Sequence, residues 1–182
     1  MKTYFSLFCV FCFGWLLCNC NVHQTYPDTP EIHYMNIVLE EVADPMGNVP
    51  IQAILNFSFI DGNGDIGKRP QDNKGVSVVC YKWYKKLSDN SYEEYEFNDE
   101  SIYNSSDIPY SNVMNKSDAQ NKTLKGSIEI VLSTPFEIEY GMPMYHGLEE
   151  IDTMYVEFYI TDRAQNKSNV ERTPDFSILP QE

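Results

Sequence analysis

Three segments of this chain alternate between apolar and polar side chains, and this alternation limits its fold more than any other feature. In the segment 51–59 every second residue is apolar, and polar residues stand at several of the positions between them. The segments 124–132 and 154–161 repeat the pattern. Successive side chains of a β-strand point to opposite faces, so a period of two predicts strands with one buried and one wet face. The sequence therefore predicts sheets rather than helices.

Further strands are expected near residues 32–42, 76–85 and 170–178, and no segment has the periodicity of an amphipathic helix. Six or seven strands separated by Gly, Asn, Asp and Pro steps predict an all-β fold, an antiparallel β-sandwich with one domain over residues 31–182. The segment 87–123 is rich in Ser, Asn, Asp, Glu and Tyr, which predicts a long polar insertion. Two alternatives stay open for its tyrosines, a sugar- or peptide-binding face and a cover for one sheet edge. These tyrosines are Tyr92, Tyr95, Tyr103 and Tyr110.

The first twenty residues are typical of an export signal. A lysine is followed by the apolar run 4–17, which is shorter than the roughly 20 residues that a membrane-spanning helix needs. Leu17 stands three residues before Cys20, the spacing used in lipoprotein processing, in which the cysteine thiol takes a diacylglyceryl group. We therefore predict a lipoprotein signal peptide over 1–19, lipidation of Cys20, and a tether over 20–30. Two or three acyl chains on one residue hold a protein stably on a membrane.

Composition limits the classes of function further. Four of the five cysteines lie in the first twenty residues, where Cys18 is the alternative lipidation site, and Cys80 stands alone in the rest of the chain. A lone thiol forms no internal disulfide, and the apolar neighbours of Cys80 indicate a buried side chain rather than a nucleophile. The formal net charge of −14 and the lack of a basic cluster argue against nucleic acid as a partner. The lipid, not charge, is expected to make the membrane contact.

The segment 57–67 (Phe-Ser-Phe-Ile-Asp-Gly-Asn-Gly-Asp-Ile-Gly) carries the clearest chemical pattern. Oxygen-bearing side chains at alternate positions, spaced by glycines that let the loop curl, suit a hard cation such as calcium. The segment is not an EF-hand loop, because Ile66 stands where the turn glycine belongs. Since calcium takes 6–8 oxygens, a second loop must contribute, and the segment 161–166 is the expected donor. The predicted calcium ligands are Asp61, Asn63, Asp65, Asp162 and Asn166.

Two structural explanations compete with calcium. Asp-Gly and Asn-Gly steps form tight turns by themselves, with the side chains capping backbone amides. Alternatively, the aspartates are simply solvated at one end of a sheet. No cofactor is certain on this basis, and calcium is the only one that the pattern favours.

Catalysis has weaker support in the sequence. His33 and His146 are the histidines of the predicted domain, and neither lies in a nucleophile-elbow or a metal-ligand spacing. We therefore predict a binding or accessory protein of unknown ligand and not an enzyme. A small glycan hydrolase that uses carboxylates near the acidic loops is the alternative.

The phrase at 57–67 resembles a recurring segment of small lipoproteins from Bacteroidetes, a family without an established activity. Those chains continue with phrases like 124–130 and 158–169, so that the resemblance spans residues 30–178. The closing phrase also resembles the end of bacterial immunoglobulin-like modules, which implies an immunoglobulin-like β-sandwich here. A glycine usually stands in those modules at the position of Gln165.

The resemblance implies a location in the bacterial cell envelope and a membrane contact through the lipid anchor. Surface-exported lipoproteins of that phylum tend to carry an acidic cluster after the lipidated cysteine, and residues 21–24 lack one. We therefore expect an outer-membrane lipoprotein that faces the periplasm, with the cell surface as the alternative. The expected partner is an unknown envelope protein or glycan.

Overall fold

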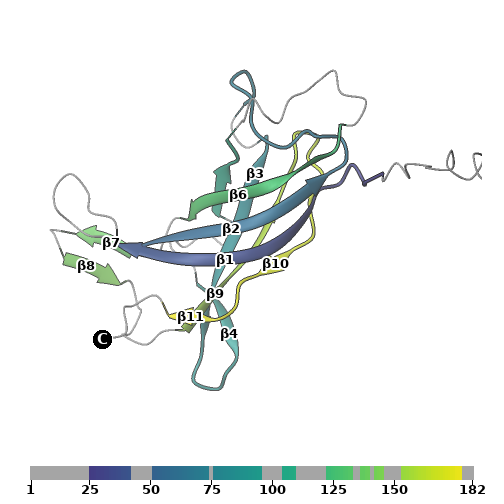
Figure 1. Ribbon diagram of the computed structural model, residues 1–182. Helices are drawn as coiled ribbons and strands as arrows, with labels where there is room; N and C mark the ends of the chain where they lie inside the picture. The colour runs from purple at the N-terminus through teal and green to yellow at the C-terminus, as the bar shows by residue number, and fades with distance from the viewer. Residues whose placement is uncertain are drawn as a thin grey trace, which may run out of the picture.

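The computed structural model describes residues 25–41, 51–73, 76–95, 104–109, 122–132, 136–139, 142–145 and 153–177. Within these ranges the chain forms eleven β-strands, which pair antiparallel, and no helix (Figure 1). The predicted all-β, antiparallel class is therefore confirmed.

Most of the strands belong to two sheets. The first sheet has the order β1-β2-β6 and contains β1 (Glu31–Glu41), β2 (Ile51–Asp61) and β6 (Leu124–Leu132). The second is built around the pair β3 (Val78–Lys86) and β9 (Thr153–Ile160), to which β4 (Tyr92–Tyr95), β5 (Asn104–Asp107), β10 (Glu171–Arg172) and β11 (Phe176–Ser177) add. A separate pair consists of β7 (Phe136–Glu139) and β8 (Met142–Tyr145).

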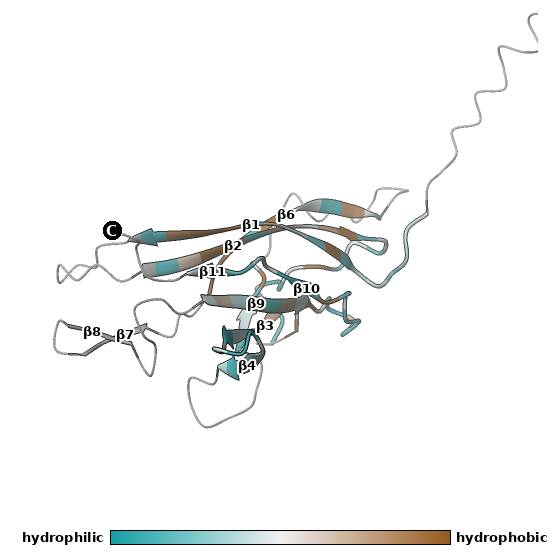
Figure 2. Ribbon diagram, turned by 90° about the horizontal axis from the view of Figure 1, so that it is seen from below, coloured by the Kyte–Doolittle hydropathy of each residue, from teal (hydrophilic) through white to brown (hydrophobic). Residues whose placement is uncertain are grey.

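The two sheets lie in separate layers (Figure 2) and share one hydrophobic core. In β2 the alternate residues Leu55 and Phe57 are fully buried, as the period of two predicts. The ring of Phe57 lies 5.3 Å from that of Phe158 in β9, so the two layers pack directly on each other. Trp83 of β3 completes the centre of this core. Full burial of each such side chain stabilises the fold by about 1.5–3 kcal/mol.

The prediction of one continuous strand over residues 170–178 is wrong. The structure has two short pairings there, β10 and β11, and both pair with β9. Pro174 lies between them and has no N–H to donate to the ladder. Thr173 stays bonded to β9, because its N–H donates to the carbonyl of Val156 and its Oγ1 accepts from the N–H of Val156.

Two strands of the predicted insertion 87–123 belong to the second sheet, since β4 and β5 both pair with β3. Tyr92 packs edge-on against Tyr155 with 4.9 Å between ring centroids, and Tyr95 packs against the core. The positions of these two side chains agree with the second alternative for the tyrosines, in which they cover part of a sheet. Tyr103 and Tyr110 lie outside the described residues.

Candidate metal centre

The loop after β2 curls around the carboxylate of Asp61. The Oδ2 atom of Asp61 accepts a hydrogen bond from the N–H of Asp65 at 2.8 Å, and Asn63 Oδ1 accepts from the same N–H at 3.1 Å. Gly64 has φ of 69°, a left-handed conformation in which glycine is unstrained. The sequence pattern of alternating oxygens and glycines thus folds as a tight loop that turns its side chains inward.

The loop after β9 is organised in the same way around Asp162. The N–H of Asn166 donates to Asp162 Oδ1 at 2.8 Å, and Asn166 Nδ2 donates to Asp162 Oδ2 at 2.7 Å. The N–H of Gln165 donates to the carbonyl of Asp162 at 3.2 Å. Such side-chain to backbone bonds are the usual way in which Asp and Asn stabilise a turn.

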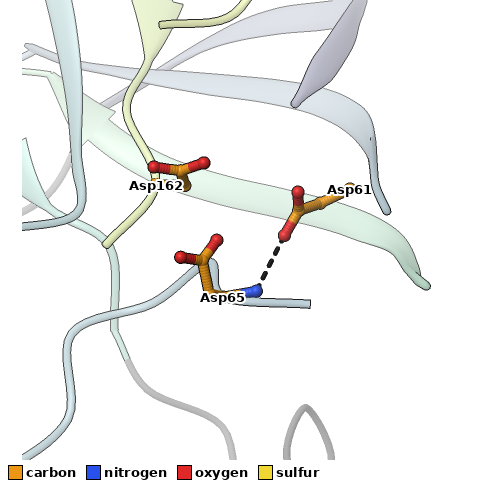
Figure 3. Close-up of side chains that lie close together, drawn as sticks. All are labelled: Asp61, Asp65 and Asp162. Carbon is orange, nitrogen blue, oxygen red and sulfur yellow. Dashed lines mark hydrogen bonds between the residues drawn. The ribbon is translucent and has the colours of Figure 1, made fainter. Parts of the chain in front are cut away.

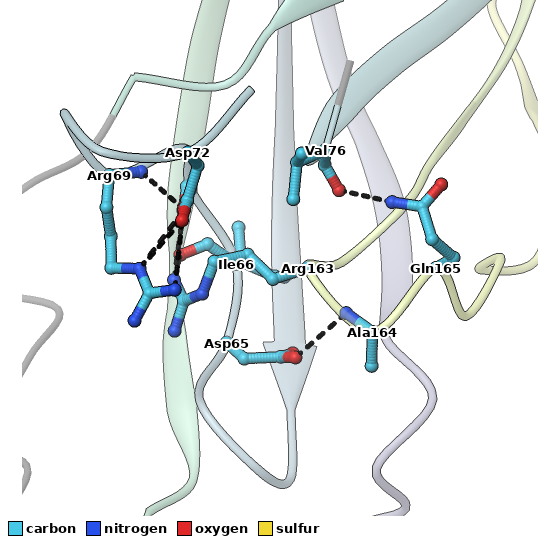
Figure 4. A network of polar contacts seen from close by, with 9 residues as sticks. Asp65, Ile66, Arg69, Asp72, Val76, Arg163, Ala164 and Gln165 are labelled. Carbon is cyan, nitrogen blue, oxygen red and sulfur yellow. Dashed lines mark hydrogen bonds and ion pairs between the residues drawn. The ribbon is translucent and has the colours of Figure 1, made fainter. Parts of the chain in front are cut away.

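The two loops meet, although about a hundred residues separate them (Figure 4). The N–H of Arg163 donates to the carbonyl of Asp65 at 3.1 Å, and the N–H of Ala164 donates to Asp65 Oδ2 at 3.1 Å. The guanidinium of Arg163 donates to the carbonyls of Ile66 and Gly67 at 3.2 and 2.9 Å. The second loop therefore holds the first one in place through both backbone and side chain.

Ser77 joins the two loops at a second point. Its Oγ accepts from the N–H of Gly67 and donates to the carbonyl of Thr161, both at 3.0 Å. Ser77 is fully buried. Neither Ser77 nor Arg163 was expected from the sequence, because a single serine or arginine beside a loop carries no pattern that marks it.

Three carboxylates come together where the loops meet (Figure 3). Asp61, Asp65 and Asp162 each offer one oxygen, and these atoms all lie within 4.8 Å of one another. Asp61 and Asp162 are 0 % exposed. The Oδ1 atoms of Asp61 and Asp65 are buried and have no hydrogen-bond partner among the described residues. A buried charge destabilises the folded state unless another group compensates it, so we expect a cation or a proton at these two oxygens.

The electrostatics of the cluster agree with this geometry. The pKa of Asp61 is raised to about 6, mainly by burial. The charges of Asp65 and Asp162 act in the same direction, and hydrogen bonds from the loop backbone oppose them. Burial is also the main cause that raises the pKa of Asp65, followed by the charge of Asp162, while Arg163 opposes the shift. The cluster therefore concentrates negative charge that one arginine compensates only in part.

The predicted ligand set divides into two groups. The carboxylates of Asp61, Asp65 and Asp162 are brought together, whereas the amides of Asn63 and Asn166 hydrogen-bond within the loops. These two amides position the carboxylates. Hard carboxylate oxygens suit calcium or magnesium, and the remaining ligands of a calcium ion would be backbone carbonyls or water.

Several predicted residues lie elsewhere. Cys20 and His146 are outside the described residues. His33 in β1 is exposed, and its Nε2 lies 3.2 Å from Glu31 Oε1. Cys80 is buried and unbonded to another cysteine, which confirms the interpretation as a buried side chain.

Comparison with protein-family models, with curated proteins and with solved structures found no match to this chain. The resemblance to Bacteroidetes lipoproteins and to immunoglobulin-like modules therefore stays a prediction. Among the residues that the structure describes, no helix is long and apolar enough to cross a membrane.

Proposed function

We propose that this protein is a lipid-anchored binding or accessory protein of the bacterial cell envelope, and that a calcium ion joins two loops of its immunoglobulin-like β-sandwich. One observation carries the calcium part. Asp61, Asp65 and Asp162 converge from two distant loops, and two of their buried oxygens lack a partner among the described residues.

Purely structural turns account less well for this arrangement. The capping of backbone amides uses Asp61 Oδ2, Asp65 Oδ2 and Asp162 Oδ1, while Asp162 Oδ2 accepts from the side-chain amide of Asn166. A neutral Asn could cap an amide as well as Asp does, because both side chains offer a carbonyl-type oxygen. Three carboxylates enclosed in one place repel one another, and a cation bound between them would compensate their charges.

The lipid anchor is supported by the spacing of Leu17 and Cys20 at the end of the apolar leader. An acylated Cys20 would attach the domain to the outer membrane on its periplasmic side, with the cell surface as the alternative. The partner would be an envelope protein or a glycan.

The alternative of a glycan hydrolase has one favourable feature, the raised pKa of Asp61 next to other carboxylates. Asp61 and Asp162 are fully buried, however, so a glycan could not reach this pair in the described conformation. Turnover of any member of a panel of envelope and host glycans would establish the alternative. The burial favours ion binding.

Thermal unfolding of the mature protein in calcium and in chelator tests the proposal. A ligand that binds only the native state at a hundred times its Kd stabilises it by about 2.7 kcal/mol, which corresponds to roughly 5–10 °C in Tm for a chain of this size. We expect a rise of that order in millimolar calcium. The variant Asp65→Asn should lose most of the rise, because it removes a charge but keeps an acceptor for Ala164.

The variant Glu129→Gln is the matched control, since it removes one negative charge from an exposed position of β6. It should keep the full calcium response. A Tm of the wild-type protein that is equal in calcium and in chelator would overturn the calcium site.

A further inference from the structure

The segment that leads from the predicted lipid anchor into the fold is attached to the candidate metal loop. We call residues 25–30 the strap. The carbonyl of Pro27 accepts a hydrogen bond from the N–H of Gly62 at 2.9 Å. Lys125 Nζ lies 3.8 Å from the ring centroid of Tyr26 and bonds its hydroxyl. Pro30 at the end of the strap is buried. Figure 1 shows this segment where it joins β1, beside the end of β2.

The surface to which the strap binds is the backbone of the metal loop itself. Gly62 directly follows Asp61, and a Cβ atom on Gly62 would lie 2.3 Å from the carbonyl oxygen of Tyr26 and 2.4 Å from that of Pro27. Such distances leave no room for any side chain, so strap and loop are in direct backbone contact.

A second glycine holds the other side of the same loop. A Cβ on Gly64 would lie 2.2 Å from the carbonyl oxygen of Lys122, just before β6. The backbone between Asp61 and Asp65 is therefore enclosed between the strap and the start of β6. A change in the spacing of these two carboxylates moves the surface on which the strap lies.

We propose that ion binding at Asp61, Asp65 and Asp162 controls the attachment of the strap, an inference that rests on the proposed function. The bound cation draws the three carboxylates together and fixes the loop in the shape that the strap contacts. Without the cation, the buried carboxylates repel one another, the loop loses this shape and the strap detaches. Two linked equilibria are reciprocal, so attachment of the strap must strengthen ion binding by the same factor.

The attachment sets how far the domain can stand from the membrane. With the strap bound, five residue steps join Cys20 to Thr25, a span of at most about 18 Å. With the strap released as far as Glu31, the linker has eleven steps and reaches about 40 Å. The ion would thus hold the metal-binding end of the domain close to the lipid surface, and its loss would free the domain to reach outward.

Distance measurement between two spin labels tests this coupling on the mature, acylated protein in detergent micelles. The labels are placed at Thr25→Cys in the strap and at Val131→Cys, an exposed position near the far end of β6, while the native Cys80 is buried. We expect one narrow distance distribution in millimolar calcium. In chelator we expect a broad distribution that extends to longer distances.

Two lysine variants provide a matched comparison. Lys125 lies over the Tyr26 ring at 3.8 Å, and Lys167 lies over the Tyr159 ring at 3.7 Å in the other loop segment. Lys125→Gln and Lys167→Gln each remove one positive charge from a lysine–tyrosine pair, but the tyrosine of the first pair belongs to the strap and that of the second to β9. We expect Lys125→Gln to bind calcium about tenfold more weakly than Lys167→Gln, the size of an ordinary coupling between sites.

The outcomes of these experiments distinguish the coupling of the strap from the metal site itself. Calcium binding by calorimetry together with the same narrow distance distribution in calcium and in chelator would overturn the coupling and leave the metal site intact. Equal calcium affinities of the two lysine variants would also overturn it. Absence of calcium binding in the wild-type protein would instead overturn the proposed function.

Discussion

Asp61 is the residue at which the stability of the fold and the proposed ion site depend on each other. It ends β2, its side chain is fully buried, and its Oδ2 accepts from the N–H of Asp65, while Oδ1 has no hydrogen-bond partner in the part of the chain that the structure describes. The residue is therefore tolerated as an anion only when a positive group compensates it. Both a cation and a proton can do this.

The ion-free protein should become less stable as the pH rises through about 6. The pKa of Asp61 is raised in the folded state from 3.8 to about 6. The stabilisation that belongs to protonated Asp61 is complete below 3.8 and is lost as the pH rises through the folded value, and a shift of this size corresponds to roughly 3 kcal/mol. We expect this loss in chelator between about pH 4 and pH 6.5, measured by denaturant unfolding.

Asp61→Asn isolates this effect, because the amide is neutral at every pH in the range. The variant should lack the step between about pH 4 and pH 6.5 that the wild-type protein shows in chelator. Equal pH profiles of wild type and variant would contradict the assignment. Saturating calcium should restore the lost stability of the wild-type protein at neutral pH, since the cation then compensates the charge.

At the scale of residues, the sequence predicted the carboxylates of the site but not the role of each amide. The alternating oxygens at 61–65 and the Asp after a strand at 162 are local patterns that a single sequence displays. The orientation of Asn166 depends on Asp162, whose two oxygens accept from its backbone N–H and from its Nδ2. A role that depends on which partner faces a side chain cannot be predicted from spacing alone.

The turn between β9 and β10 is the element on which the position of Asp162 depends. Gln165 has φ of 67°, a left-handed conformation that glycine adopts more easily. Its side chain compensates, because Nε2 donates to the carbonyl of Val76 at 2.5 Å and to that of Asp162 at 3.3 Å. The turn thus takes the shape expected of a glycine at this position while it carries a side chain that links two segments.

Gln165→Gly and Gln165→Ala should therefore differ in stability. Both variants lose the two hydrogen bonds of the amide, but only alanine keeps a Cβ in the left-handed conformation. We expect Gln165→Gly to be more stable than Gln165→Ala by about 1 kcal/mol in chemical denaturation. A more stable alanine variant would show that the turn has another backbone conformation.

The strands that could be predicted alternate between apolar and polar residues in their own sequence. Those that could not be predicted form through pairing with a neighbouring strand. The segments 51–59 and 124–132 alternate clearly, and β2 and β6 follow them within two residues at each end. The short strands β4 and β5 have no comparable pattern, and they form by pairing with β3. The contacts of Asn169 could not be predicted from the sequence either. Its side-chain amide accepts a hydrogen bond from the N–H of Ile32 at 2.8 Å and donates one to the carbonyl of Ile32 at 2.9 Å.

At the scale of the whole molecule, the end of the first sheet that carries the metal cluster is also the end at which the chain enters the fold. Glu31 pairs with Ile60 and Asp61 with Leu124, so the start of β1, the end of β2 and the start of β6 lie together. An anchor at Cys20 would therefore act on this end of the domain. The proposed orientation toward the membrane depends on that acylation.

Metabolic labelling with radioactive palmitate tests the anchor. We expect the wild-type protein and Cys18→Ser to incorporate the label and Cys20→Ser to incorporate none, because only Cys20 has Leu17 three residues before it. Cys18→Ser is the matched control for loss of a thiol in the leader. Label in Cys20→Ser, or none in the wild type, would contradict the assignment.

One thiol offers a way to observe how this domain opens. Cys80 lies in β3 between Ser105 of β5 and Tyr159 of β9, and it is buried without a disulfide partner. An alkylating reagent reaches its sulfur faster when the side chains that cover it move apart. The rate of alkylation would therefore report how often this part of β3 becomes uncovered, with no engineered label needed.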